Sequence, residues 1–208
     1  LGNGAKGYMN KMVTDLANPN VPMVMKRVTS DENKKNAEAF QETTRLMPQN
    51  STKTAISDTL MNKVEKLNHV KQVEKAFDIA PSDFTVSLGI TKEPFSEIQT
   101  WTNVNTDSSL LAGEKPSEGE VAVPDTFAKK WDKTNWKKII GETLHLEYKM
   151  LNKYGAPVAI SQDVKVSGIT KGSPAQNPLT MNFKTLQKSF VANHIVSEPN
   201  FIVPTIDD

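Results

Sequence analysis

The stretch GEKPSEGEVAVPDTFAKKW, which runs from Gly113 to Trp131, packs a turn, a strand and the start of a helix into nineteen residues. Pro116 and Gly119 flank a turn, because these two residue types favour the backbone angles that turns need. Val121 and Val123 then alternate with a glutamate and an alanine, which is the period-two pattern of a strand. The stretch is specified for shape, and the rest of the chain must show what that shape serves.

A helix follows the strand directly. Pro124 closes the strand, and Asp125 is expected to cap the helix. Phe127, Ala128 and Trp131 supply the apolar side of that helix. The stretch has no histidine, no cysteine and no serine-nucleophile pattern, so local rules account for its fold and leave its purpose open.

Composition places the chain among soluble globular proteins of one domain or two small ones. The 208 residues include 37% hydrophobic and 24% charged residues, and the formal net charge is +1. Binding to nucleic acid would therefore require a local basic patch, and the nearest approach is KKWDKTNWKK at Lys129–Lys138. Its lysines surround two tryptophans that could stack on bases, but a solvated helix end explains them better. We expect no nucleic-acid partner.

The chain contains no cysteine, which removes disulfides, thiolate catalysis and most structural zinc sites. This composition is compatible with an extracytoplasmic protein of a Gram-positive bacterium. The sequence starts at Leu1 and contains no apolar run long enough for a membrane span or a signal peptide. We therefore expect it to be a piece of a longer protein.

The first eighty residues predict alternating helices and strands. Thr29–Lys53 is polar and fits either a short helix from about Asn33 to Thr44 or a mobile excursion. A helix is predicted where Ile56, Leu60, Val64 and Leu67 share one face. The other predicted elements are a helix over Tyr8–Leu16, a strand over Val21–Val28 and a strand over Val70–Ile79.

Beyond Pro81 the pattern changes to short alternating segments separated by Gly, Pro, Asn or Asp. The predicted β segments lie around Phe84–Leu88, Ser96–Val104, Val121–Val123, Leu144–Tyr148, Val158–Ile160 and Val164–Ile169. The chain then predicts a strand at Leu179–Phe183, a helix through Leu186, Phe190 and Val191, and a strand at Phe201–Ile206. We therefore predict an α+β fold in which residues 1–80 and 177–208 form one strand-helix-strand subdomain. Residues 81–176 form a β-rich inserted subdomain.

The candidate catalytic and metal-binding residues do not form recognised patterns. His69, His145 and His194 have no partner at metal-ligand spacing, so we expect no metal site, and His145 is predicted on the wet face of its strand. No glycine-rich phosphate loop is present, so we expect no cofactor. Glu118 and Glu120 stand two apart on one predicted strand face, the proximity that acid–base pairs use, but nothing marks them as buried.

The aromatic residues Phe127, Trp131 and Trp136 are the candidates for contact with a partner. Buried aromatic side chains usually serve the core first, so core packing is the favoured interpretation. No partner-binding residue is assigned on this basis.

Four segments occur in an order that resembles the extracytoplasmic domain of MacB/FtsX-type ABC transporter permeases, the MacB-like periplasmic core. They are Leu110–Gly113, Glu120–Val123, Ile140–Leu144 and Val166–Ile169. Leu1–Met12 resembles the helix that continues from the first membrane span of that family, and Leu60–Glu74 resembles its helix and strand before the β insert. The resemblance covers nearly the whole chain.

The resemblance implies a porter-like α+β subdomain built from both chain ends, on the extracellular face of the bacterial cytoplasmic membrane. It implies no catalytic centre and no cofactor. The implied partners are an ABC ATPase subunit, reached through membrane segments outside this chain, a membrane-fusion-like adaptor or envelope protein, and a peptide or small-molecule substrate. Export of peptides or antibiotics, resistance to them, or envelope remodelling is the implied process. The alternatives are a secreted binding protein or adhesin, and a cell-wall-directed enzyme that uses Glu118 or Glu120.

The resemblance also suggests a mechanism. Both chain ends would reach the membrane, so the middle section and the polar excursion are expected to meet the partner. If the helix over Tyr8–Leu16 continues a membrane span, ATP-driven movement would tilt the domain as a rigid body.

Overall fold

The computed structural model describes residues 24–25, 55–103, 105, 109–173 and 177–206. The strands are β1 (Val24–Met25), β2 (Val70–Ala76), β3 (Asp78–Ile79), β4 (Ser82–Leu88), β5 (Thr91–Pro94), β6 (Ile98–Thr100), β7 (Leu110–Gly113), β8 (Glu120–Pro124), β9 (Thr143–Leu151), β10 (Pro157–Thr170), β11 (Leu179–Met181) and β12 (Phe201–Ile206). The helices are α3 (Asp58–Glu65), α4 (Asp125–Trp131), α5 (Phe183–Ala192) and the 3-10 helix η2 (Trp136–Ile139). The predicted α+β class is confirmed.

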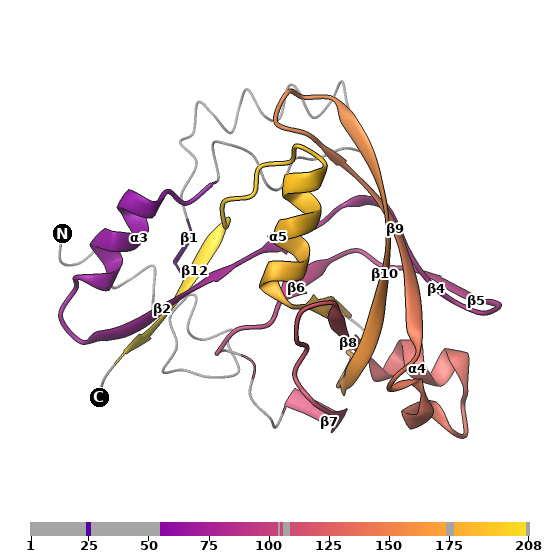
Figure 1. The fold of residues 1–208 in the computed structure, drawn as a ribbon. Coiled ribbons are helices and arrows are strands. Elements are labelled where there is room, and N and C mark those ends of the chain that lie inside the picture. The colour runs from indigo at the N-terminus through magenta and orange to yellow at the C-terminus, as the bar shows by residue number, and fades with distance from the viewer. Residues whose placement is uncertain (1–23, 26–54, 104, 106–108, 174–176, 207–208) are drawn as a thin grey trace.

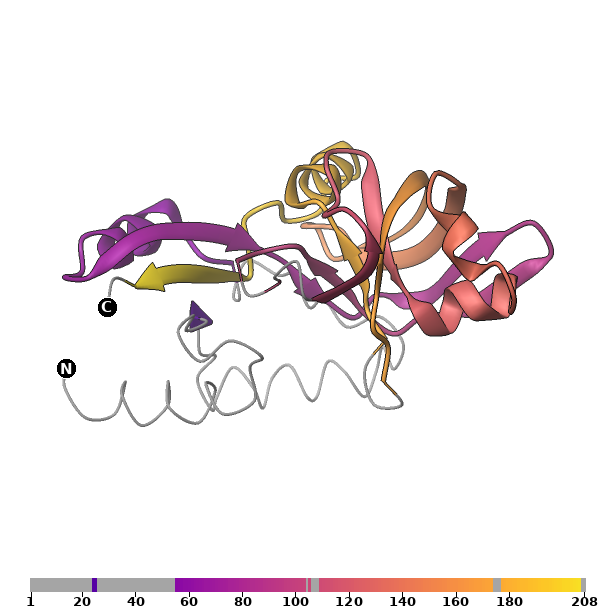
Figure 2. The ribbon, with the colours of Figure 1, turned by 90° about the horizontal axis from the view of Figure 1, so that it is seen from below.

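The strands form two sheets that share no strand. A three-stranded sheet has the order β1-β12-β2, and a nine-stranded sheet has the order β3-β6-β11-β8-β10-β9-β4-β5, with β7 on β10. Figures 1 and 2 show the small sheet and α3 at one end of an elongated molecule, the large sheet with α4 at the other, and α5 between them.

The small sheet is held by one helix and an antiparallel strand pair. The Ser57 hydroxyl accepts a hydrogen bond from the Leu60 N–H (3.3 Å) and so starts α3, close to where the sequence predicts a helix. β2 and β12 pair along their length, from Ala76 opposite Phe201 to Val70 opposite Ile206. The core of this sheet consists of Ile56, Val64, Ala76, Phe201, Ile202 and Val203.

The single strand predicted over Val70–Ile79 is wrong: the structure divides it at Phe77 into β2 and β3, which belong to different sheets. Phe77 is fully buried, its N–H donates to the Thr100 hydroxyl (2.9 Å), and its carbonyl accepts from the Thr100 N–H (3.0 Å). The Asn200 amide also binds the backbone of Asp78, accepting from its N–H (2.9 Å) and donating to its carbonyl (2.6 Å). Periodicity could not reveal this change of sheet, because both strands are extended.

The large sheet carries the main core, against which α4 and α5 pack. β9 alternates as predicted, with Leu144, Leu146, Tyr148 and Met150 buried. β8 does not alternate: Val121 to Pro124 are all buried, because β8 lies between β10 and β11 inside the sheet. Asn182 accepts hydrogen bonds from two N–H groups at the start of α5 and so caps this helix.

Two predictions for the end of the chain change in the structure. β11 pairs with β6 and β8 in the large sheet, whereas β12 pairs with β2, so the expected second strand-helix-strand unit is divided between the two sheets. The two segments predicted at Val158–Ile160 and Val164–Ile169 form one strand of 14 residues, β10. The division into residues 1–80 with 177–208 and residues 81–176 stays a prediction.

Several predictions lie outside the described residues. These are the helix over Tyr8–Leu16, the polar excursion Thr29–Lys53 and most of the strand Val21–Val28, of which only β1 is described. Among the helices of the described residues, none has the length and apolar character needed to cross a bilayer.

Candidate functional site: a groove beside β10

The four segments that carry the sequence resemblance meet around β10. Val121 of β8 pairs in parallel with Val166, and Gly113 of β7 pairs with Gly168. The Gly141 N–H donates to the Val166 carbonyl (2.8 Å). Gly113 has φ +77°, and a Cβ there would lie 2.8 Å from the Cα of Gly168, so only glycine fits this crossing. These segments form a structural centre of the large sheet.

β10 is longer than the strands beside it, and this leaves one edge half open. β9 pairs with it from Pro157 to Lys165, but β8 pairs with it only from Lys165 onward. The chain enters β8 through a turn in which Gly119 has φ +83°, and the Gly119 N–H donates to the Thr185 hydroxyl of α5 (2.7 Å). This turn carries the chain away from the first half of β10.

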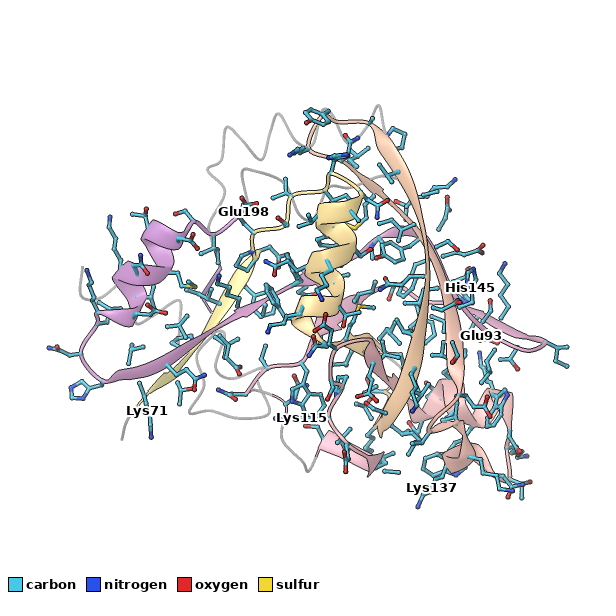
Figure 3. All side chains as sticks on the ribbon, viewed as in Figure 1. Lys71, Glu93, Lys115, Lys137, His145 and Glu198 are labelled. Atoms are coloured by element: carbon cyan, nitrogen blue, oxygen red, sulfur yellow. The ribbon has the colours of Figure 1, made fainter. Side chains whose placement is uncertain are left out.

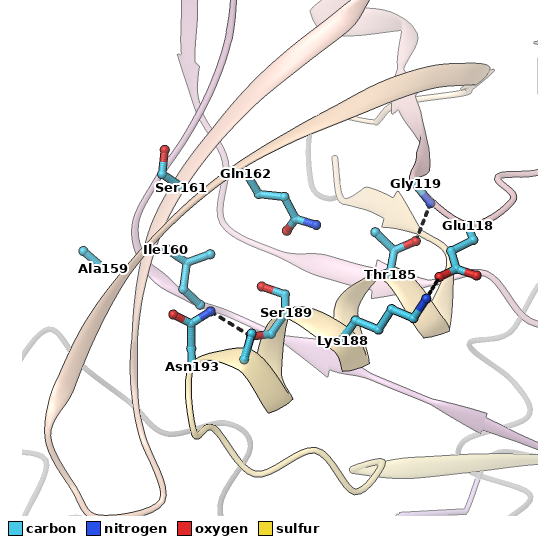
Figure 4. Close-up of a pocket in the computed structure, with 11 residues that line it drawn as sticks. Glu118, Gly119, Ala159, Ile160, Ser161, Gln162, Thr185, Lys188, Ser189 and Asn193 are labelled. Atoms are coloured by element: carbon cyan, nitrogen blue, oxygen red, sulfur yellow. Dashed lines mark hydrogen bonds and ion pairs between the residues drawn. The ribbon is translucent and has the colours of Figure 1, made fainter.

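A groove of about 640 Å³ lies between the open half of β10 and α5 (Figure 4). Its walls are formed by Ala159, Ile160, Ser161 and Gln162 of β10, by Thr185, Lys188, Ser189, Ala192 and Asn193 on the α5 side, and by Glu118 and Gly119 at one end. Side chains from both faces of β10 line it, which means that the edge of the strand itself is exposed to the groove.

Polar atoms without a full set of partners lie at this groove. Gln162 points from β10 into the space beside α5 (Figure 4), and its Oε1 atom is buried. The Tyr148 hydroxyl is also buried, and neither atom has a hydrogen-bond partner of good geometry among the described residues. Burial raises the pKa of Tyr148 to about 12, and the nearby Ser189 hydroxyl opposes part of this rise. Unsatisfied polar atoms of this kind favour a polar occupant.

The two candidate acid–base carboxylates do not form a pair, which corrects the prediction. Glu118 lies in the turn before β8 and not on the strand, where it forms an ion pair with Lys188. The hydrogen bond and the positive charge of Lys188 lower the pKa of Glu118. Glu120 instead accepts a hydrogen bond from the Ser117 N–H (3.1 Å). Both carboxylates serve the turn that ends the groove.

His145 lies on the exposed face of β9, as predicted, but it has neighbours that the sequence did not indicate. Its Nδ1 is 2.7 Å from Asp163 Oδ1, and its Nε2 is 3.1 Å from the Ser161 hydroxyl. The hydrogen bond to Asp163, with the charges of Asp163 and Glu147, raises the pKa of His145. Ser161, His145 and Asp163 are the residue types of a hydrolase triad, in which the aspartate is buried. Here the His145 and Asp163 side chains are 45% and 69% exposed on an open strand face, so the arrangement differs from such a triad. No group of three His, Cys, Asp or Glu side chains suited to a metal occurs in the described part of the chain.

The aromatic candidates serve the core. Phe127 is 2% exposed, and Trp131 and Trp136 pack against the main core while half-buried. Two of the five lysines in this segment form ion pairs, since Lys129 pairs with Asp125 (2.6 Å) and Lys130 pairs with Glu93 (2.7 Å). Figure 3 shows the labelled side chains on different elements of the fold, from Lys71 on β2 to Lys137 in η2.

Asp125 lies inside α4 and does not cap it, which corrects the sequence prediction. The residue before the helix is Pro124, which makes no side-chain capping bond. The Asp125 carboxylate accepts hydrogen bonds from the Gly172 N–H (2.8 Å) and from Lys129, so it ties α4 to the loop after β10.

The junction between the sheets contains one strongly perturbed acid. Burial, together with the hydrogen bond that protonated Asp78 donates to Glu97 and the negative charge of Glu97, raises the pKa of Asp78 from 3.8 to about 8. Asp78 follows Phe77, at the point where the chain passes from one sheet to the other. The loop after β6 braces the same region, because the Asn103 N–H donates to Glu74 (2.6 Å) of β2.

Sequence reasoning did not find the groove. Its signal is the unequal length of β8 and β10, which are 5 and 14 residues long. The sequence predicted β10 as two separate segments, so this difference was hidden.

The fold is similar to that of one transporter ectodomain of known structure. Among solved structures it is similar to an extracellular domain of an ABC-type transporter. That structure is the extracellular domain of the noncanonic ABC-type transporter YknZ from Gram-positive bacteria, with a TM-score of 0.51 and 14% identity over 74% of this chain and 75% of that chain. The sequence matches no protein-family model and no curated protein. At this identity, the likeness shows a shared fold.

Proposed function

We propose that this chain is the extracellular domain of an ABC transporter permease. It has no catalytic role: it binds a substrate or an envelope partner outside the cytoplasmic membrane and transmits motion that an ATPase subunit or domain generates on the inner side. The finer assignment is a permease of MacB/FtsX type that exports peptides or antibiotics or gives resistance to them. This part of the proposal rests on the four segments around β10.

The observation that carries the proposal is the likeness in fold to the extracellular domain of YknZ, over about three quarters of both chains. The two-part shape supports it. The small sheet is tied to the large one by the hydrogen bonds of Phe77 with Thr100 and by those of the Asn200 side chain with the Asp78 backbone. A force applied to β2 and β12 is therefore passed to the large sheet.

Cysteine labelling tests whether this domain lies on the outer side of the cytoplasmic membrane. The chain has no cysteine, so one introduced thiol reports on this domain alone. Ile90 is fully exposed between β4 and β5, and Ala128 is fully buried in α4. In the full-length protein with no other cysteine, we expect Ile90→Cys to react with a membrane-impermeant maleimide on intact cells. Ala128→Cys, the matched control, should react only after denaturation.

The other outcomes discriminate between the classes of protein. Reaction of Ile90→Cys only after cell lysis would contradict the proposal. Labelled protein found free in the medium, and not in the membrane fraction, would favour the secreted binding protein or adhesin.

A second experiment tests the mechanical role. Asn200→Ala removes both hydrogen bonds to the Asp78 backbone and should loosen the junction. In the full-length transporter with its ATPase, we expect substrate movement to fall while ATP hydrolysis continues. Asn62→Ala, at an exposed position of α3, is the control. Unchanged transport in Asn200→Ala would show that a stiff junction is not required.

A further inference from the structure

The open half of β10 presents unpaired backbone groups, and their direction follows from two hydrogen bonds. The Lys165 N–H donates to the Gly119 carbonyl (3.0 Å), on the side of β8. The Val166 N–H donates to the Glu142 carbonyl (2.9 Å), on the side of β9. Because successive residues of a strand direct their backbone groups to opposite edges, every second residue before Lys165 faces the side of β8.

These residues are Ala159, Ser161 and Asp163. β8 does not extend to them, so their N–H and C=O groups have no strand partner among the described residues. Ala159 and Ser161 line the groove beside α5. Proteins usually cover an exposed strand edge, because such an edge is a template for another extended chain.

We propose that this edge binds an extended peptide as an added strand, which lies in the groove between β10 and α5 on the line that β8 would follow. The inference rests on the proposed function in one respect: the bound peptide would be the substrate of the transporter. Main-chain hydrogen bonds to Ala159, Ser161 and Asp163 supply the binding, and the groove selects alternate side chains.

The shape of the groove favours a single linear peptide. α5 forms one wall, and the Glu118–Lys188 ion pair closes one end (Figure 4). A folded partner with its own sheet would collide with α5, whereas one extended chain can enter. The volume of about 640 Å³ lies within the range of roughly 300–1,000 Å³ that is usual for ligand sites.

The side chains of the peptide can be specified by face. Those that point inward meet Gln162 Oε1, an acceptor without a partner, so hydroxyl side chains fit there. Those that point outward lie on the face of Asp163 and Glu147, whose carboxylates flank His145. Glu147 also pairs with Lys92 (3.6 Å), so Asp163 is the carboxylate on the open edge itself. A cationic side chain fits the outward position beside Asp163. The preferred ligand is therefore a peptide that alternates small hydroxyl residues with basic ones.

The test uses the full 208-residue chain and an acetylated, amidated hexapeptide of alternating lysine and threonine. On binding, hydrogen exchange should slow at the amides of Ala159, Ser161 and Asp163. Exchange at Ile160 and Gln162 should change little, because those amides already bond to β9. The absence of slower exchange at the three edge amides with the peptide in excess would overturn the proposal.

Two N-methylated hexapeptides separate backbone pairing from general attraction. One is methylated on the backbone nitrogen of every lysine, and the other on the backbone nitrogen of every threonine. An added strand directs alternate N–H groups towards β10, so one of the two peptides should bind as the parent does and the other should lose binding. Equal binding by both, or loss by both, would contradict strand addition.

Variants at Ser161 of β10 test the same backbone hydrogen bonds from the side of the protein. Ser161→Pro removes one edge N–H without breaking the pairing with β9, and Ser161→Ala keeps that N–H. We expect the peptide to bind Ser161→Pro at least about tenfold more weakly than Ser161→Ala, in line with the loss of a main-chain hydrogen bond. Equal affinity would overturn the proposal.

The wall of the groove provides a second pair that does not touch the backbone of β10. Ala192→Arg places a large side chain in the groove. Val191→Arg alters the preceding residue of α5, which is 60% exposed and does not line the groove. Only Ala192→Arg should weaken binding. If the peptide fails to bind while Ile90→Cys is labelled on intact cells, this inference falls and the proposed function stands.

Discussion

The two sheets of this protein differ in the size and chemistry of their cores. The large sheet buries a continuous apolar core that includes aromatic contacts, such as Phe77 stacked on Phe183 with ring centroids 4.8 Å apart. Among the described residues, the small sheet has the short cluster around Ile202 and Val203, which lies under α3. Because apolar stabilisation scales with buried area, the large sheet supplies most of the stability.

This difference assigns the parts distinct roles. The small sheet should open locally at a lower free energy than the large one, and it keeps its orientation through the junction at Phe77 and Asn200. The large sheet can then carry an open strand edge, because its core does not depend on that edge. The experiments below test this contrast, from the largest expected effect to the smallest.

The largest effect should come from the crossing of β7 and β10. A Cβ on Gly168 would lie 2.6 Å from the Glu114 carbonyl oxygen and 3.0 Å from Leu110. We expect Gly168→Val to lower the free energy of unfolding by about 3 kcal/mol or more, since backbone atoms must shift to admit the side chain. Urea unfolding would measure this loss.

Gly155→Ala is the control for that experiment. Gly155 has φ +83° but open space around it, so alanine should cost only about 1 kcal/mol of backbone strain. Equal losses in the two variants would show that the crossing of β7 and β10 is not tightly packed.

The next effect separates the two sheets. Ile202 is fully buried in the small core, and Ile202→Ala should cost roughly 2–4 kcal/mol. Hydrogen exchange should accelerate in β2 and β12, while the amides of β9 and β10 keep their protection. Leu146→Ala, in the large core, is the counterpart, and it should accelerate exchange in both sheets. Uniform acceleration in Ile202→Ala would mean that the two sheets unfold as one unit.

A smaller, pH-dependent effect is expected at the junction. The pKa of Asp78 is raised from 3.8 to about 8, so the folded protein keeps a proton that the unfolded chain releases between these values. Asp78 therefore makes stability fall as pH rises through this window. Asp78→Asn should remove this slope and be more stable than the native protein at pH 8, by on the order of 2 kcal/mol. Parallel pH profiles for the two proteins would contradict the assignment.

Local patterns predicted much of the fold. The alternation of Leu144, Leu146 and Tyr148, the apolar face of α5 and the turn at Gly119 all follow from local chemistry, and each is present. The failures involve partners far along the chain. The break at Phe77 depends on Thr100, and the position of β11 depends on β6 and β8.

The groove was beyond local reasoning for the same reason. It exists because β8 begins only after Gly119, whose N–H bonds to Thr185, 66 residues further on. The contact of His145 with Asp163 likewise depends on the register of β9 and β10. Spacing in the sequence could place each residue on a strand face, but it could not bring the faces together.

The smallest expected effect concerns the outer face of β10. The hydrogen bond that His145 donates to Asp163, followed by the charges of Asp163 and Glu147, raises the pKa of His145 above its ordinary value. The folded state therefore favours protonated His145, and this contribution is present at low pH and lost as pH rises past the raised pKa. Asp163→Asn should lower the pKa of His145, measured by NMR titration, with little change in stability at pH 8. An unchanged pKa would show that water screens the pair on this exposed face. Because Asp163 also belongs to the open edge, the same variant should keep the backbone groups that bind the peptide and lose only the charge that favours its lysines.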